Sequence, residues 1–210
     1  MRALVLLLTA IGLLVASPAA SARDVSLFSG DLAFLYGRNW GQQLNVAGLA
    51  GELKLDLVPQ LAIGVRAGGA LGGGIGVRGA ERSARGYAGL PLLLKAEASP
   101  LSSRTRPYVG LAVGVTRAAG GGAMASIEQD AARTASWSVV GPMPTVMPEI
   151  GLDLGGFRMA LVHASLVGSA RAVEQSYEVT ADGARTSARR APGLSGTSLQ
   201  VGVHFGGPKG

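Results

Sequence analysis

Apolar residues alternate with small or polar residues over segments of about ten residues along much of the chain. The clearest segment runs from Leu49 to Leu57, where leucine and glycine occupy the odd positions and Glu52, Lys54 and Asp56 occupy even ones. A helix would spread these three charges around its circumference, whereas a strand places them all on one face. The two-residue period therefore predicts β-strands.

Eight segments share this alternation, and each has one apolar face and one face of small or polar residues. They span residues 25–36, 45–57, 60–70, 86–98, 106–117, 144–154, 157–168 and 196–206. Segments of this length and pattern, separated by turn residues, are typical of transmembrane barrels. We therefore expect an all-β fold, an eight-stranded antiparallel up-and-down transmembrane β-barrel.

The small-or-polar face carries ionisable residues among many glycines and alanines, as expected where a narrow barrel closes around a limited volume. Ten residues are predicted to form a charge network in the lumen: Asp31, Glu52, Lys54, Asp56, Arg66, Lys95, Glu97, Glu149, Asp153 and Arg158. We expect Arg66 to pair with Glu52 or Asp56. We also expect Lys95 to pair with Glu97. Such a network predicts a plugged barrel, and a narrow ion-conducting path is the alternative.

The connections between the predicted strands alternate in length. The longer ones are residues 37–44, 71–85, 118–143 and 169–195, and the shorter ones are 58–59, 99–105 and 155–156. Outer-membrane barrels with both termini in the periplasm have short periplasmic turns and longer outer loops. We therefore expect the longer set, which is rich in glycine, serine and charge, to form mobile extracellular loops that carry any exposed function.

Four residues inside the predicted strands need separate treatment. Pro91 and Pro148 have no amide hydrogen to donate to a ladder, so we expect β-bulges at both positions. The alternation also turns two aromatic side chains, Tyr87 and Tyr108, toward the interior.

The first 22 residues have the features of a cleaved signal peptide. Arg2 supplies a positive start, residues 4–15 form an apolar run, and residues 20–22 are small. The apolar run is shorter than the roughly 20 residues that a membrane-spanning helix needs. We therefore expect residues 1–22 to be removed and residues 23–210 to form one exported barrel domain.

Composition excludes several classes of protein. The chain contains no cysteine, so it has no disulfide framework and no thiolate metal site. Its 33 glycines show no Gly-X-Y period, which excludes collagen. The two histidines lack a metal-binding motif, and residues 72–76 lack the ending of a nucleotide loop. We expect no metal and no cofactor.

With the signal peptide, the eight alternating segments and a last strand ending in an aromatic residue at Phe205, the chain resembles the small eight-stranded outer-membrane β-barrel family, which includes the OmpA-like transmembrane domain. The resemblance covers nearly all of residues 23–210. It leads us to expect a monomer in the outer membrane of a Gram-negative bacterium, surrounded by lipid. We expect a structural or surface-interaction role through the long loops.

The formal net charge is +6, and much of the basic excess lies in the long connections. The arginines there are Arg78, Arg82, Arg85, Arg133, Arg171, Arg185, Arg189 and Arg190. Guanidinium groups pair well with phosphates, so lipopolysaccharide headgroups are a candidate partner, and loop solubility is the alternative. Nucleic acid is not expected, because no recognition motif accompanies the charge.

Two other functions stay open at this point. His163 and Ser165 share one face of a predicted strand, and His163-Ala164-Ser165 resembles the His-x-Ser element of outer-membrane lipid A deacylases. In that reading Glu174 or Glu178 orients the imidazole, although the asparagine that follows serine in that family is replaced by leucine here. The other alternative is a soluble periplasmic lipocalin-like barrel or β-sandwich, because alternation alone does not identify what the apolar face touches.

Overall fold

The computed structural model describes residues 25–39, 44–58, 60–78, 81–101, 105–128, 131–166, 173–180, 185–190 and 194–208. The predicted signal peptide lies outside these residues. Within them the chain forms one antiparallel sheet of ten strands. The strands are β1 (Val25–Asn39), β2 (Leu44–Val58), β3 (Leu61–Arg78), β4 (Glu81–Ala98), β5 (Arg106–Glu128), β6 (Ala131–Asp153), β7 (Phe157–Leu166), β8 (Val173–Thr180), β9 (Arg185–Arg190) and β10 (Gly196–Pro208).

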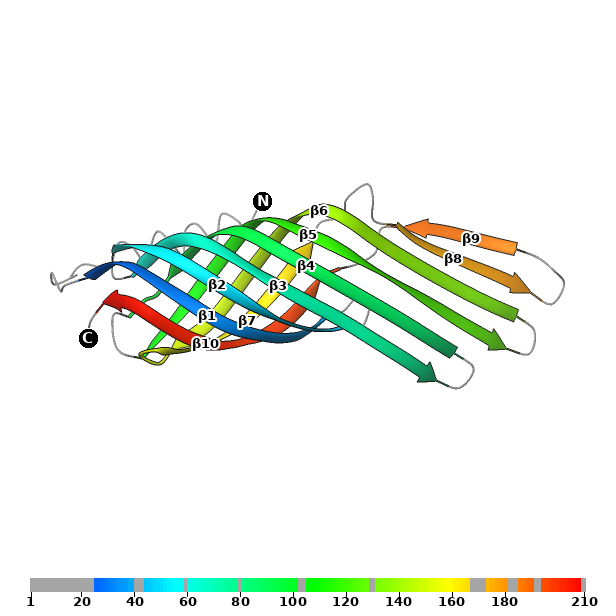
Figure 1. Ribbon diagram of the computed structural model, residues 1–210, viewed down its shortest axis with the longest axis horizontal. Coiled ribbons are helices and arrows are strands. Elements are labelled where there is room, and N and C mark those ends of the chain that lie inside the picture. Colours follow the sequence, from blue (N-terminus) through cyan, green and yellow to red (C-terminus); the bar gives the residue numbers. More distant parts are fainter. Residues whose placement is uncertain are drawn as a thin grey trace.

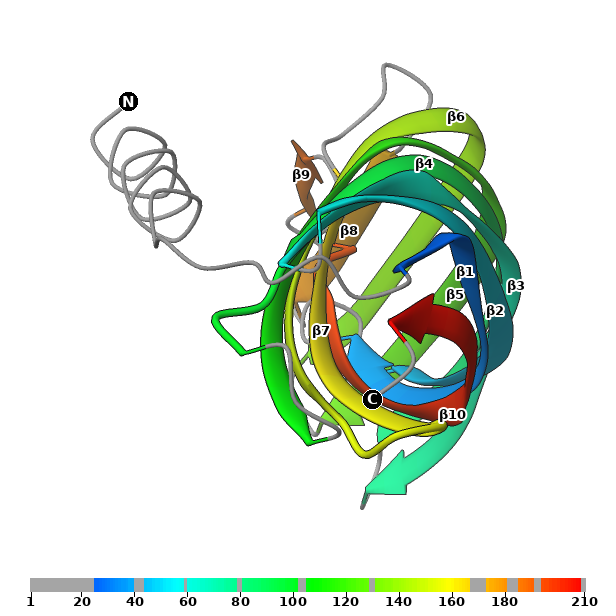
Figure 2. The ribbon, with the colours of Figure 1, turned by 90° about the vertical axis from the view of Figure 1, so that its left-hand side faces the viewer.

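Eight of these strands close into a ring. Strands β1 to β7 pair in sequence order, and β10 joins β7 to β1. In the view of Figure 2, β10 lies beside β1 and completes the wall of the barrel. A closed ring leaves no unpaired edge, so it satisfies the backbone hydrogen bonds of its strands without water. The predicted eight-stranded up-and-down barrel is confirmed.

The barrel has its apolar side chains outside and its charged side chains inside. Leu53 is 71% exposed and Leu94 is 66% exposed, whereas Lys54 and Lys95, their chain neighbours, are each 3% exposed. A soluble lipocalin-like barrel or sandwich would bury the leucines and expose the lysines. The soluble alternative is therefore wrong, and hydrocarbon is the solvent that suits this outer surface. Among the described residues, no helix is long and apolar enough to cross a membrane.

Strands β3 to β6 run far beyond the ring, at the end opposite the start of β1 and the end of β10 (Figure 1). Strand β8 pairs with residues 131–138 of β6, and β9 pairs with β8, so the projection is an open sheet. The expectation that residues 71–85, 118–143 and 169–195 form loops is wrong, because the described residues of these segments are mostly paired in strands. Residues 118–128 of β5 keep an unbroken register with residues 131–141 of β6.

The two strand prolines do not cause bulges. Pro91 pairs with Thr116 on one side, and the register between β3 and β4 is the same before and after it. Pro148 pairs with Leu111, and the register between β6 and β7 is likewise unchanged. The ladder is interrupted beside each proline on one side only, which is where the missing N–H would have donated. The bulge prediction is therefore wrong.

The turn between β6 and β7 is set by two glycines. Gly155 has φ of 73° and Gly156 has φ of 120°, in the region that other residues rarely adopt. The Leu154 amide donates a hydrogen bond of 2.7 Å to the Phe157 carbonyl across them. A two-residue turn with both φ values positive matches the right-handed twist of an antiparallel hairpin. It brings β7 back beside β6 in the correct register.

The interior of the ring has two levels. Charged side chains fill the level near the two termini. An apolar cluster occupies the outer level, with Leu44, Val139, Met143 and Leu194 at its buried centre and Tyr87 packed against it. The ends with the short turns are the periplasmic side in barrels of this topology, so the apolar level is the extracellular one.

Replacing Leu94 with arginine should lower the free energy of unfolding in lipid vesicles by about 2–4 kcal/mol, because the new charge enters the hydrocarbon. Ala84, on the same outward face of β4 but in the projecting sheet, is the matched control. Ala84→Arg should cost about 0–1 kcal/mol, as for a position outside the bilayer centre. Urea titration monitored by tryptophan fluorescence measures both. Equal losses in the two variants would contradict the assignment of the outer face to lipid.

Candidate functional site

The ten residues predicted for the lumen all lie on the inner face of the ring, and all are buried. They come from six strands: Asp31 on β1; Glu52, Lys54 and Asp56 on β2; Arg66 on β3; Lys95 and Glu97 on β4; Glu149 and Asp153 on β6; and Arg158 on β7. Their inward direction follows from the strand alternation, since residues two apart share a face. Closure of the ring then brings opposite strands within reach of one another.

One group of contacts is centred on Glu149. Its carboxylate accepts a hydrogen bond of 2.8 Å from Arg66 and a second from Lys95. Arg66 also lies 3.2 Å from Glu52, and Lys95 lies 2.8 Å from the other oxygen of Glu52. Two carboxylates and two cations therefore alternate in space. Of the two partners predicted for Arg66, the structure provides Glu52.

A second group of contacts is centred on Arg158. Its guanidinium donates to Asp31 at 2.8 Å and to Glu97. Lys54 contacts the same two carboxylates, at 2.8 Å from Asp31 and 3.4 Å from Glu97. Lys95 lies 3.4 Å from Glu97, the pairing expected from the sequence, and so links the two groups. The four carboxylates and four cations of the two groups balance in formal charge.

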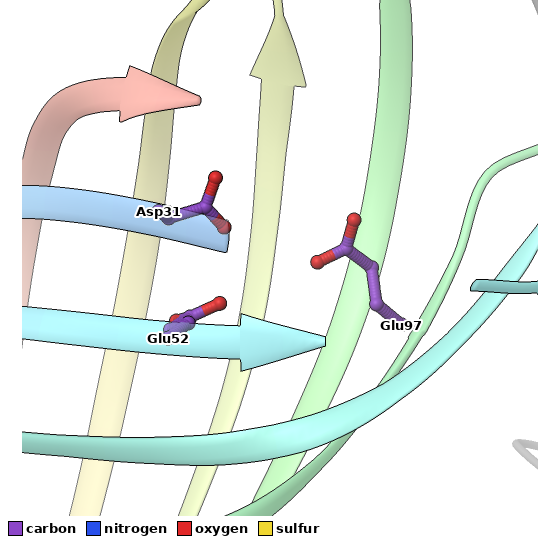
Figure 3. A group of neighbouring side chains, drawn as sticks. All are labelled: Asp31, Glu52 and Glu97. Carbon is purple, nitrogen blue, oxygen red and sulfur yellow. The ribbon is translucent and has the colours of Figure 1, made fainter. Parts of the chain in front are cut away.

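Three carboxylates of this network meet closely enough to suggest a metal site. Oxygen atoms of Asp31, Glu52 and Glu97 lie within 4.8 Å of one another, and Figure 3 shows the three side chains converging from β1, β2 and β4. Each of them already contacts Lys54, Lys95, Arg66 or Arg158. Positive charge is thus supplied by the protein itself. We therefore describe an ion-pair network here, and the acidic cluster carries no metal assignment.

The network continues toward the end of the barrel where the termini lie. His204 Nδ1 is 2.6 Å from Asp31, and Arg106 Nε donates to Asp153 at 3.4 Å. Asp56 is the other residue expected to pair with Arg66. Its Oδ1 instead accepts a hydrogen bond of 3.0 Å from the Ser29 hydroxyl. Within the described residues its Oδ2 has no hydrogen-bond partner. Of the two predicted alternatives, Arg66 therefore pairs with Glu52 and not with Asp56.

Sequence reasoning did not include Arg106, Tyr108 and His204 in the network. The Arg158 guanidinium lies over the Tyr108 ring, 3.6 Å from its centroid, in a cation–π contact. A side chain at Gly151, the cross-strand partner of Tyr108, would collide with that ring, so glycine provides the space that the tyrosine fills. The alternation that placed the ten residues inward also turns Arg106, Tyr108 and His204 inward. This alternation is the sequence signal that could have found them.

Charged side chains occupy the lumen at this level. They extend from several walls of the ring, and they are almost fully buried. Removing one partner of a buried ion pair leaves an uncompensated buried charge, which costs about 3–5 kcal/mol. The network therefore fixes the interior of the ring.

The proposed deacylase residues occupy a different surface. His163 and Ser165 are on the outward face of β7, and both are partly buried. The Nδ1 atom of His163 lies 3.0 Å from the Thr197 hydroxyl oxygen. The histidine is therefore oriented by a neighbouring strand of the ring.

The two glutamates of that hypothesis lie elsewhere. Glu174 on β8 pairs with Trp137 of β6. Val162, the residue before His163 on β7, pairs with Glu149 of β6. These two positions on β6 are twelve residues apart, roughly 40 Å along a strand. Glu178 lies farther out still, opposite Arg133. The prediction that either glutamate orients His163 is wrong, because β8 joins the projecting sheet.

The closed ring, its apolar outer surface and its charged interior define an outer-membrane β-barrel, and the protein is located in the outer membrane. No protein-family model and no curated protein matches the chain. The structure is similar to a major outer membrane protein from Thermus thermophilus, with 14% sequence identity, a TM-score of 0.49 and coverage of 85% of this chain and 99% of that one.

Two further solved structures align with most of the chain. The N-terminal β-barrel domain of Pseudomonas aeruginosa OprF is 14% identical, with a TM-score of 0.34 over 87% of this chain and all of that one. Ail, the attachment invasion locus protein of Yersinia pestis, is 14% identical, with a TM-score of 0.35 over 86% of this chain and 98% of that one. The fold is assigned from the closed ring and its apolar outer surface, and not from these similarities.

Replacing Lys95 with methionine should lower the free energy of unfolding by about 3–5 kcal/mol, because three carboxylates lose a shared cation. The double variant Lys95→Met/Glu149→Gln should recover part of this loss, since one excess charge is removed with its partner. Urea titration in lipid vesicles measures the double variant and its two single variants, Lys95→Met and Glu149→Gln. Arg106→Met, at the end of the barrel, is the control and should cost less. A double variant that loses the sum of the two single losses would contradict a coupled network.

Proposed function

We propose that the protein is a closed outer-membrane anchor that presents a rigid sheet at the cell surface. The observation that carries the proposal is the length of β3 to β6, which continue past the ring and are joined there by the β8–β9 hairpin. Strands that only have to span the hydrocarbon need about 9–11 residues, whereas β5 and β6 have 23 residues each. The additional length serves contact outside the bilayer.

A transport role through the lumen is disfavoured by the plug. The charged level crosses the ring, and the apolar cluster lies beyond it on the extracellular side. An eight-stranded ring has an interior that side chains fill. The protein therefore acts through its surface and not through a pore.

Purified protein inserted into planar lipid bilayers should carry no steady current above that of protein-free bilayers, because buried ion pairs close the lumen. Heat-dependent mobility on a gel verifies that the sample is folded. Recordings with large, sustained conductance steps would contradict the closed anchor and would support the ion-conducting alternative.

We further propose that the outer rim binds phosphate groups of lipopolysaccharide. Arg38 on β1 and Arg117 on β5 are exposed on the outward face. Two residues before each arginine, on the same face, lies an exposed apolar residue, Tyr36 on β1 and Val115 on β5. Aromatic and basic residues are typical of the level where hydrocarbon meets headgroups. Arg82, from the set expected to contact lipopolysaccharide, is exposed on the outward face of β4, but it lies eight residues beyond Leu90, the cross-strand partner of Arg117, in the projecting sheet. The guanidinium groups of Arg38 and Arg117, at the level of the rim, suit the phosphates of lipid A.

The double variant Arg38→Gln/Arg117→Gln should bind lipid A more weakly, by roughly fivefold per arginine, since each contributes on the order of 1 kcal/mol. Native mass spectrometry of the intact protein, with lipid A and with lipid A lacking its phosphates, measures the affinity. The double Arg→Lys variant keeps the charges and should keep most of the affinity, and Arg82→Gln, in the projecting sheet, is the control that should keep it all. Equal binding of both lipids, or no loss in the double glutamine variant, would contradict the phosphate contact.

A further inference from the structure

The outer level of the lumen contains a cavity of about 100 Å³ above the charge network. Arg66 and Gln200 line its floor, Tyr87 and Met147 line its wall, and Leu44 lies at its outer end. Its lining is mainly apolar. The proposed function makes no use of this space, because surface contact involves the outside of the barrel.

Small residues create this cavity. Inward-facing positions at this level hold Gly37, Ala70, Gly89, Ala164 and Gly196, where the level below holds lysine, arginine and carboxylates. Protein interiors are normally packed to the density of organic crystals, and each unfilled apolar volume costs stability. Cavities of similar size that are lined by apolar side chains stay dry and bind apolar molecules such as benzene. An unfilled space in a barrel this narrow therefore points to a ligand.

The surroundings define the chemistry of that ligand. Arg66, the charged group of the floor, is already compensated by Glu52 and Glu149, so an ionic ligand would have no counter-charge at the floor. Arg38 also borders the cavity at its outer end, but it is exposed on the outward face of β1. The wall from Gln200 to Gly196 spans four residues, roughly 13 Å along the strand. We propose that the cavity binds one small uncharged apolar molecule, with the size of a substituted benzene ring or a short alkyl chain.

Methionine methyl signals test the proposal directly. Met147 lines the cavity, whereas Met159 is exposed on the lipid-facing side of β7. The full chain, labelled with ¹³C at the methionine methyls and reconstituted in lipid nanodiscs, is titrated with toluene. Met147 should shift and reach saturation, while Met159 should drift in proportion to the toluene dissolved in the lipid. Parallel, unsaturated shifts of both signals would overturn the proposal.

A pair of variants on one strand separates the cavity from the membrane. Ala70→Leu places a larger side chain in the cavity, and it should weaken the saturable binding of toluene at least tenfold. Ala67→Leu puts the same side chain on the exposed outer face of β3 and should leave binding unchanged. Ala164→Leu fills the cavity from β7 and replaces the first variant if Ala70→Leu does not fold. Wild-type affinity in a folded cavity-filling variant would overturn the proposal.

Discussion

Mutual neutralisation of the charges in the lumen is the interaction on which this barrel depends. Glu149, Arg66, Lys95 and Arg158 come from four different strands, and none of them is near enough to water to be neutralised otherwise. Because the partners reach across the ring, the network ties together strands that share no backbone hydrogen bonds. It also explains why the outer face is apolar at the level of the network, since the charged residues at that level point inward.

The alternation of apolar and polar residues along each strand explains both the closed ring and its apolar outer surface. Each strand has one face for hydrocarbon and one for the lumen, so a shift of one residue would reverse both. The lumen then divides by residue size, with long charged side chains at the level of the termini and small residues at the outer level. Beyond the ring the lipid constraint ends, and β3 to β6 continue as an open sheet whose pairing alone sustains it.

The strand faces could be read from the sequence, but two features could not. The inward direction of Arg66 and Arg158 follows from a period of two, yet their partners Glu149 and Asp31 lie 83 and 127 residues away and depend on how the ring closes. The projecting strands were missed because residues such as those at 118–123 are mostly glycine and alanine. Such residues show no contrast between faces, although their backbone pairs as well as any other.

Lipid touches one face of these strands, and the charge network fills the other. The chain has no cysteine, so single cysteines carrying a nitroxide label can be placed along β4 from position 90 to 97 in lipid vesicles. Electron paramagnetic resonance should find high collision rates with oxygen at Leu90, Leu92 and Leu94, and low rates at Leu93. Uniform rates along the strand, or the opposite alternation, would contradict the account.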